Sequence, residues 1–139
     1  MEQEINILIV EDNLAHLKIT EYILREKQVA GKYIIVRDGQ EALDYMFNNG
    51  QYVDKELHCR PDLVLLDLNL PQRDGREVLK ILNDDPTLRM VPVVIVSTSD
   101  REEDIRYALD HGAVGYISKS SGFETFREEL GRVGKFVRR

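Results

Sequence analysis

The feature that most constrains the fold is an alternation of short apolar runs with longer segments of helical period. Five runs of strand length occur along the chain: Ile5–Val10, Tyr33–Val36, Leu63–Leu66, Pro92–Val96 and Ala113–Ile117. Consecutive apolar positions are typical of parallel strands that are covered on both faces. Their alternation with helical segments favours a parallel sheet flanked by helices. The sequence therefore predicts an α/β fold of five β/α units.

Apolar spacing and end signals predict the helices between these runs. The apolar residues with helical spacing form two stripes, Ala15, Ile19, Tyr22 and Ile23 in the first helix and Phe123, Phe126, Leu130, Val133 and Val137 in the last. Three pairs of residues have the spacing of an N-cap followed by the Glu of a capping box: Asp38 with Glu41, Asp100 with Glu103, and Ser121 with Glu124. We expect a helix to begin at each pair.

Size and charge exclude several classes of protein. The 139 residues fit one domain, which typically holds roughly 100–200 residues, so we expect a single domain over residues 1–139 with no output domain. The net charge of −6 repels phosphate backbones, and we expect no nucleic-acid partner. No apolar run approaches the ~20 residues that cross a bilayer. We therefore expect a cytoplasmic protein that does not contact membranes.

Polar residues directly follow four of the predicted strands. Glu11-Asp12 follows the first strand, Asp67 the third, Ser97-Thr98 ends the fourth, and Ser118-Lys119 follows the fifth. The carboxyl ends of parallel strands share one edge of a sheet, where ligands bind. We therefore expect three carboxylates, a hydroxyl and an ammonium to meet at one edge.

Three carboxylates held together repel one another unless a cation lies among them. Oxygen ligands without His or Cys suit Mg²⁺ or Mn²⁺. Such a cation usually also holds a phosphate, and Lys119 and Thr98 are suited to contact phosphate oxygens. The pattern therefore predicts phosphoryl chemistry, with Asp67 as the candidate nucleophile.

In these motifs the chain resembles the receiver domain of a two-component response regulator, similar to the single-domain chemotaxis type. The matching residues are Glu11-Asp12, Asp67 to Pro71 with Asp74-Gly75, Ser97 to Ser99, and Gly115 to Lys119. The stretch DLNLPQRDGREVLKILNDD resembles more narrowly the response regulators of bacterial and cyanobacterial phytochromes. The resemblance implies a flavodoxin-like, doubly wound (βα)5 fold with strand order 2-1-3-4-5.

The resemblance also implies a phosphorelay function. Asp67 would accept a phosphoryl group from a sensor histidine kinase, with a phytochrome as the narrower expectation. Asp12 and Asp67 would bind Mg²⁺ directly, Glu11 would act through water, and the backbone carbonyl of Asn69 would add a ligand. Phosphotransfer and autodephosphorylation would be self-catalysed rather than those of a conventional enzyme.

The remaining implied roles concern the response to phosphorylation. Lys119 would pair with the phosphoryl oxygens, Thr98 would hydrogen-bond one of them, and Tyr116 would change rotamer. Asn69 and Asp100 would tune the lifetime of the acyl phosphate. The predicted surface for an unknown downstream partner or a homodimer contains Tyr107, Tyr116, Phe123 and Phe126.

One position departs from the family pattern. Receivers usually carry a proline after the lysine, often with a cis bond, whereas Ser120 follows Lys119 here. A cis bond before a residue other than proline costs about 2.5–4 kcal/mol. The usual geometry of this loop therefore cannot be assumed.

Two other functions remain open from the sequence. An inert, receiver-like interaction module would lack some site residue, but all the acidic residues, Thr98 and Lys119 are present. An aspartyl-nucleophile phosphatase needs a second Asp two residues after the first, where this chain has Asn69. The adjacent His58 and Cys59 have no second pair at zinc spacing, and we interpret them as part of a surface loop.

Overall fold

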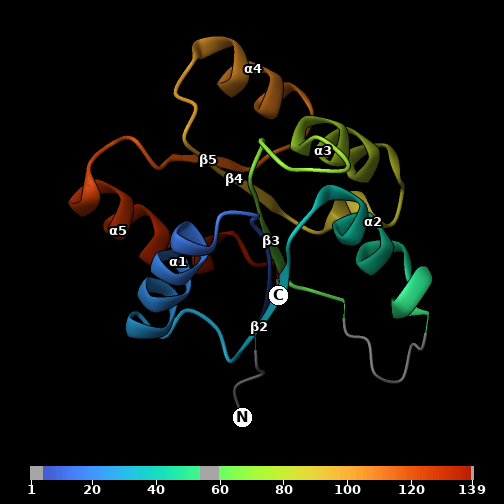
Figure 1. The fold of residues 1–139 in the computed structure, drawn as a ribbon, viewed down its shortest axis with the longest axis horizontal. Coiled ribbons are helices and arrows are strands. Elements are labelled where there is room, and N and C mark those ends of the chain that lie inside the picture. The colour runs from blue at the N-terminus through green and yellow to red at the C-terminus, as the bar shows by residue number, and fades with distance from the viewer. Residues whose placement is uncertain (1–4, 54–59, 139) are drawn as a thin grey trace.

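The computed structural model describes residues 5–53 and 60–138, and in them five parallel strands form one sheet (Figure 1). The strand order is β2-β1-β3-β4-β5, which confirms the predicted flavodoxin-like topology. The strands are β1 (Asn6–Val10), β2 (Lys32–Val36), β3 (Leu63–Leu66), β4 (Val93–Ser97) and β5 (Gly115–Ser118). Each lies within two residues of its predicted bounds, and β3, which carries Asp67 at its end, is central.

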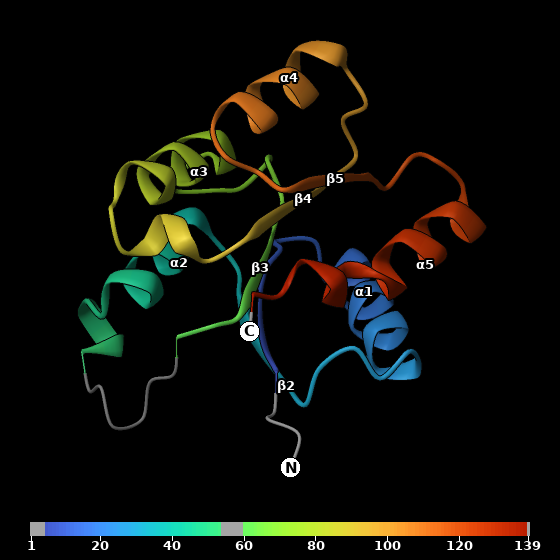
Figure 2. The same ribbon diagram turned by 180° about the vertical axis from the view of Figure 1, so that it is seen from behind.

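Helices cover both faces of the sheet (Figures 1 and 2). The α-helices are α1 (Leu14–Glu26), α2 (Gly39–Phe47), α3 (Gly75–Asp84), α4 (Glu102–Asp110) and α5 (Phe123–Gly131). Short 3₁₀ helices follow α2, α3 and α5 at Gly50–Tyr52, Leu88–Met90 and Val133–Phe136. Helices α1 and α5 lie on one face, and α2, α3 and α4 on the other. Within the described residues, no helix has the length and apolarity that crossing a membrane requires.

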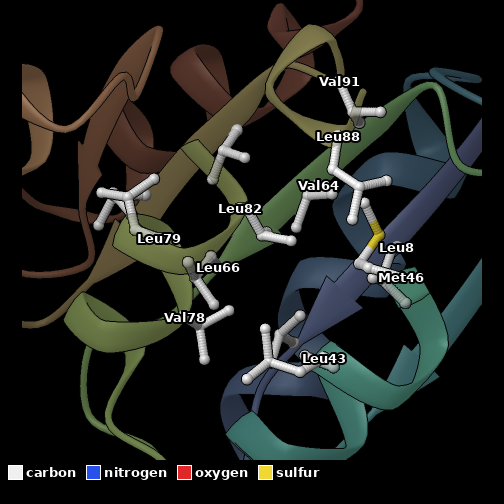
Figure 3. Close-up of a cluster of buried hydrophobic side chains, with 14 of the residues drawn as sticks. Leu8, Leu43, Met46, Val64, Leu66, Val78, Leu79, Leu82, Leu88 and Val91 are labelled. Carbon is white, nitrogen blue, oxygen red and sulfur yellow. The ribbon is translucent and has the colours of Figure 1, made fainter. Parts of the chain in front are cut away.

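The strands contribute alternate side chains to two separate cores. Leu8 and Leu66 point to the core beneath α2, α3 and α4, which Figure 3 shows. Ile7 and Leu65 point to the core beneath α1 and α5. Because both faces of the central strands are buried, these strands read as uninterrupted apolar runs in the sequence. The two cores hold the carboxyl ends of β1, β3 and β4 in a fixed arrangement.

The predicted apolar stripe of α1 is wrong in all but one position. The helix buries Leu17, Thr20, Ile23 and Leu24, whereas Ala15, Ile19 and Tyr22 are exposed. Two overlapping sets of apolar residues have helical spacing in this segment, one with Ile19 and Tyr22 and the other with Leu17 and Leu24. Packing against the sheet and α5 buries the set with Leu17 and Leu24. Ile19 and Tyr22 therefore remain on the surface.

Two of the three predicted capping boxes are also wrong. Asp38 caps α2 through the amide of Glu41, as predicted. Helix α4 instead has Arg101 at its N-cap position, and α5 has Gly122 with a φ of 97°. The Ser121 hydroxyl does not cap α5, because it donates to the carbonyl of Ser118.

The last helix is shorter than predicted. Helix α5 ends at Gly131, and Val133 lies in the 3₁₀ helix that follows, although it still packs in the core. The predicted loop containing His58 and Cys59 lies outside the described residues.

Candidate phosphoryl-transfer site

Asp67 lies directly after the central strand and is 7% exposed. Its amide donates to the carbonyl of Val10 at 3.1 Å, which ties it to the end of β1. Its Oδ1 atom accepts a hydrogen bond from the Asn69 amide at 3.1 Å. Its Oδ2 atom accepts one from Lys119 Nζ at 3.0 Å. The carboxylate is therefore held in one orientation.

Gly75 accounts for the close approach of α3 to Asp67. A Cβ atom at this position would lie 2.1 Å from the Asp67 carbonyl oxygen and 2.6 Å from the Cα of Leu68. The Gly75 amide also donates to the Leu68 carbonyl at 2.8 Å. Gly75 is not among the positive-φ glycines, so close backbone contact, and not turn geometry, requires glycine here.

Lys119 directly follows β5. Its ammonium lies between the two buried carboxylates of the site. It forms ion pairs with Glu11 and Asp67, and its Nζ atom is also 3.2 Å from His16 Nδ1. The Lys119 side chain is only 7% exposed. Residues from β1, α1, β3 and β5 thus meet at the predicted edge of the sheet.

Glu11 is buried and Asp12 is exposed. Burial raises the pKa of Glu11, and the opposing hydrogen bond and charge of Lys119 offset only part of this effect. The second carboxylate oxygen of Glu11 accepts from the Asn13 amide at 3.0 Å. The backbone carbonyl of Asp12 accepts from Arg37 at 2.8 Å, which fixes the loop that carries both acidic residues.

These acidic residues fit a hard divalent cation by the chemistry of their donor atoms, which are all carboxylate oxygens. In the described part of the chain, however, no three His, Cys, Asp or Glu side chains are gathered as a ligand group. Lys119 pairs with both Glu11 and Asp67.

The loop after β4 connects the site to β5. The Thr98 carbonyl accepts from the Ser120 hydroxyl at 2.8 Å, and the Ser99 carbonyl accepts from the Tyr116 hydroxyl at 2.7 Å. Burial raises the pKa of Tyr116. Among the described residues no peptide bond is cis, so Lys119 is positioned by a trans loop.

A cavity of about 270 Å³ opens beside Lys119 and Thr98. Its other lining residues are His16 and Ile19 from α1 and Phe123 and Phe126 from α5. Its lining combines polar and apolar side chains. Lys119 therefore contacts both this cavity and the buried carboxylate of Asp67.

A charged cluster between α3 and α4 lies beside the site and is not indicated by the sequence motifs. Asp104 is 4% exposed and accepts hydrogen bonds from Arg76, Arg101 and the Ser99 hydroxyl. Burial alone would raise the pKa of Asp104, but these three hydrogen bonds outweigh it and lower the pKa to about 2. Only the fold brings together Arg76 and Asp104, which are 28 positions apart.

The other predicted residues are more scattered. Asn69 and Asp100 are exposed at the ends of β3 and β4. Phe126 is 6% exposed and packs in the core, while Phe123 is 57% exposed. Tyr107 is half-buried, and its hydroxyl donates to the carbonyl of Arg76. His16, by contrast, was not predicted, because a lone histidine in a helix carries no motif.

Comparison with known proteins finds similar sequences among response regulators. A family model of the response regulator receiver domain matches residues 7–130. The response regulator Rcp1 of Synechocystis sp. is 39% identical over 114 residues, which cover 82% of this chain and 76% of Rcp1.

Two solved structures are similar over nearly the whole chain. The phosphorylated cyanobacterial phytochrome response regulator RcpA has a TM-score of 0.86 and 39% identity, with 97% of this chain and 94% of that one covered. The Mn²⁺-bound form of response regulator Rcp1 has a TM-score of 0.84 and 34% identity, with 96% and 94% covered.

Proposed function

The chain belongs to the response regulator receiver family, and on this premise we propose that it accepts a phosphoryl group from a sensor histidine kinase onto Asp67. The observation that carries the proposal is the 3.0 Å contact between Lys119 Nζ and Asp67 Oδ2 at the buried end of β3. The same lysine lines a cavity of about 270 Å³. We expect a phosphodonor to approach Asp67 from the side of this cavity.

The transfer forms one bond and breaks another. A carboxylate oxygen of Asp67 attacks the phosphorus of a phosphohistidine, and a P–O bond forms as the P–N bond breaks. The P–N electron pair remains on the imidazole nitrogen, which takes up a proton. The ammonium of Lys119 stabilises the negative charge on the phosphoryl oxygens, because it is already placed at this carboxylate.

A divalent cation, Mg²⁺ or Mn²⁺, would be held directly by the side chains of Asp12 and Asp67 and by the carbonyl of Asn69, and by Glu11 through water. When bound, it supplies positive charge opposite the phosphoryl oxygens. The donor chemistry supports this role, as does the Mn²⁺-bound form of the related Rcp1. We expect Asp12→Ala to abolish cation-dependent phosphorylation, and full phosphorylation of that variant would contradict the assignment.

Incubation with phosphoramidate and Mg²⁺, followed by intact-mass measurement, tests the phosphoacceptor. Wild type should gain one phosphoryl group and Asp67→Asn none, while Asp110→Asn, at an exposed carboxylate on α4, should behave as wild type. Rapid hydrolysis of general phosphoesters would instead favour the phosphatase. Absence of any modification would favour the inert interaction module.

We further propose that the phosphodonor is a phytochrome-type kinase. The support is the similarity to RcpA, which is described as a cyanobacterial phytochrome response regulator. Purified phytochrome kinases should transfer phosphate to this chain faster than histidine kinases without a photoreceptor. Equal rates from both classes would contradict the narrower proposal and leave the receiver function intact.

Phosphorylation would be communicated through Thr98 and Tyr116. Thr98 lines the cavity, and Tyr116 is hydrogen-bonded to the carbonyl of the next residue, Ser99. A Thr98 hydroxyl drawn to the phosphoryl group would shift this carbonyl and release the tyrosine. Thr98→Ala should therefore be phosphorylated without a change in the NMR signals of the Tyr116 ring.

A further inference from the structure

The ammonium of Lys119 has three N–H donors, and three acceptors surround it. Two are the carboxylates of Glu11 and Asp67, and the third is His16 Nδ1 at 3.2 Å. An ammonium only donates, so Nδ1 is the acceptor and the proton of the neutral imidazole is on Nε2. His16 thus completes the coordination of the lysine without belonging to any motif of the site.

The first turn of α1 places His16 beside Lys119. It lies in the first turn of α1, where its amide donates to the Asn13 side chain at 3.0 Å. Its ring lines the cavity together with Lys119 and Thr98. Burial and the charge of Lys119 lower the pKa of His16, which favours the neutral ring that accepts a hydrogen bond.

Lys119 is fixed at its backbone as well as at its ammonium. Its amide donates to the Ser97 carbonyl at 2.7 Å, and the next residue, Ser120, is tied to the Thr98 carbonyl. Between these anchors runs a flexible side chain with a four-carbon stem. The direction of the ammonium therefore depends on its three acceptors.

Two of the three acceptors are engaged by the proposed reaction itself. Asp67 becomes the acyl phosphate, and Glu11 is one of the residues assigned to the cation. His16 is the only acceptor among the three that takes no part in either event. We propose that His16 is a positioning residue that keeps the Lys119 ammonium beside Asp67 while the phosphoryl group is transferred. This inference rests on the proposed phosphoacceptor function.

Three substitutions at His16 separate the hydrogen bond from side-chain bulk. Asn places an acceptor oxygen where Nδ1 lies, Gln places it one bond farther out, and Leu fills similar space without an acceptor. The readout is the phosphorylation rate with phosphoramidate at saturating Mg²⁺. His16→Leu should be slowed about fivefold, the effect of losing one hydrogen bond. His16→Asn should stay within about twofold of wild type, and His16→Gln should recover less than His16→Asn.

The controls exclude effects on the helix and on the cation. Lys18→Leu, at an exposed position of α1, should react at the wild-type rate. The Mg²⁺ affinity should be unchanged in all His16 variants. Leu is a better helix former than Asn, so damage to α1 alone would slow the Asn variant more than the Leu variant, which is the opposite order.

Equal rates for wild type and His16→Leu would overturn the inference, as would equal slowing of the Leu and Asn variants. A loss of Mg²⁺ affinity that matches the loss of rate would also overturn it. In these cases wild type would still be phosphorylated on Asp67, so the proposed function would stand. If wild type is not phosphorylated at all, the proposed function fails and this inference fails with it.

Discussion

Gly75 lies at the start of α3, against the backbone of Asp67. A Cβ atom added to Gly75 would lie 2.1 Å from the Asp67 carbonyl oxygen, so there is no room for a methyl group. Any larger residue must displace either α3 or the end of β3. The position of the phosphoacceptor therefore depends on a glycine outside the set of reacting groups.

We expect Gly75→Ala to lower the free energy of unfolding by about 1–3 kcal/mol, the usual effect of overpacking. The phosphorylation rate should fall as well, because Asp67 moves relative to Lys119. Urea unfolding and phosphoramidate labelling measure the two effects. Gly134→Ala is the matched control, since the atom nearest to its added Cβ would be Val29 Cγ1 at 3.7 Å, an ordinary contact. Equal stability of both variants would contradict the steric argument.

Asn69 and Asp100 are exposed two residues beyond Asp67 and Thr98. We propose that they flank the path of the water that hydrolyses the acyl phosphate. Replacing either with Arg should change the dephosphorylation rate without changing Mg²⁺ affinity. The decay of phosphorylated protein after removal of the donor measures this rate. Unaltered decay in both variants would place the water path elsewhere.

At the scale of elements, Asp104 joins α4 to α3. Its carboxylate pairs with Arg76 at 2.8 Å and accepts from the Ser99 hydroxyl in the loop after β4. The same loop carries Thr98 and receives the Tyr116 hydroxyl. The cluster therefore holds the β4–α4 loop against α3, at the place where phosphorylation is expected to act.

The charge of Asp104 should make stability depend on pH in a defined window. The pKa of Asp104 is lowered to about 2 from its ordinary value of 3.8. The folded state therefore favours the ionised form, and this contribution is complete above about pH 4 and is lost as the pH falls through about 2. Its size is about 2 kcal/mol.

Urea unfolding tests this prediction. Wild type and Asp104→Asn are compared from about pH 5 down to about pH 2. The difference in stability between them should shrink as the pH falls. Asp84→Asn, which breaks an exposed pair with Lys80, should differ little from wild type at either end. A constant difference for Asp104→Asn would show that its effect is not electrostatic.

At the scale of the whole molecule, the face formed by α4, β5 and α5 is the proposed surface for signal output. Phe126 lies in the core and is unavailable for contact, while Phe123 is 57% exposed. Tyr107 and Tyr116 are half-buried, and each donates a hydrogen bond to a backbone carbonyl. The surface would therefore involve Phe123 and the edges of the two tyrosines.

We expect beryllofluoride, a phosphate mimic, to strengthen a homodimer through this face. The coupling free energy between two binding events, here the phosphate mimic and the second subunit, is typically about 1–3 kcal/mol. The dimer dissociation constant should therefore fall about 5- to 150-fold. Sedimentation velocity measures it. Phe123→Glu should remove the shift, whereas Val53→Glu, at an exposed apolar residue beyond α2, should retain it. Monomers in both states at micromolar concentration would contradict dimerisation.

The sequence alone determined the strands and the chemistry at their ends. Apolar runs such as Leu63–Leu66 mark buried parallel strands, and the geometry of a parallel sheet then brings Glu11, Asp67 and Lys119 to one edge. These predictions succeed because strand burial and edge position follow from local patterns and from the topology of the fold. The residues proposed to carry the phosphoryl chemistry can therefore be predicted from the sequence before the structure is known.

The tertiary structure decided which face of α1 is buried, where α4 and α5 begin, and which side chains support Lys119. Helical spacing allows more than one apolar stripe in α1, and only the packing against the sheet and α5 selects Leu17 over Ile19. His16 is 103 positions from Lys119, and Asp104 is 28 from Arg76. Contacts between such distant residues depend on how helices are placed on the sheet, and local periodicity holds no information on that placement.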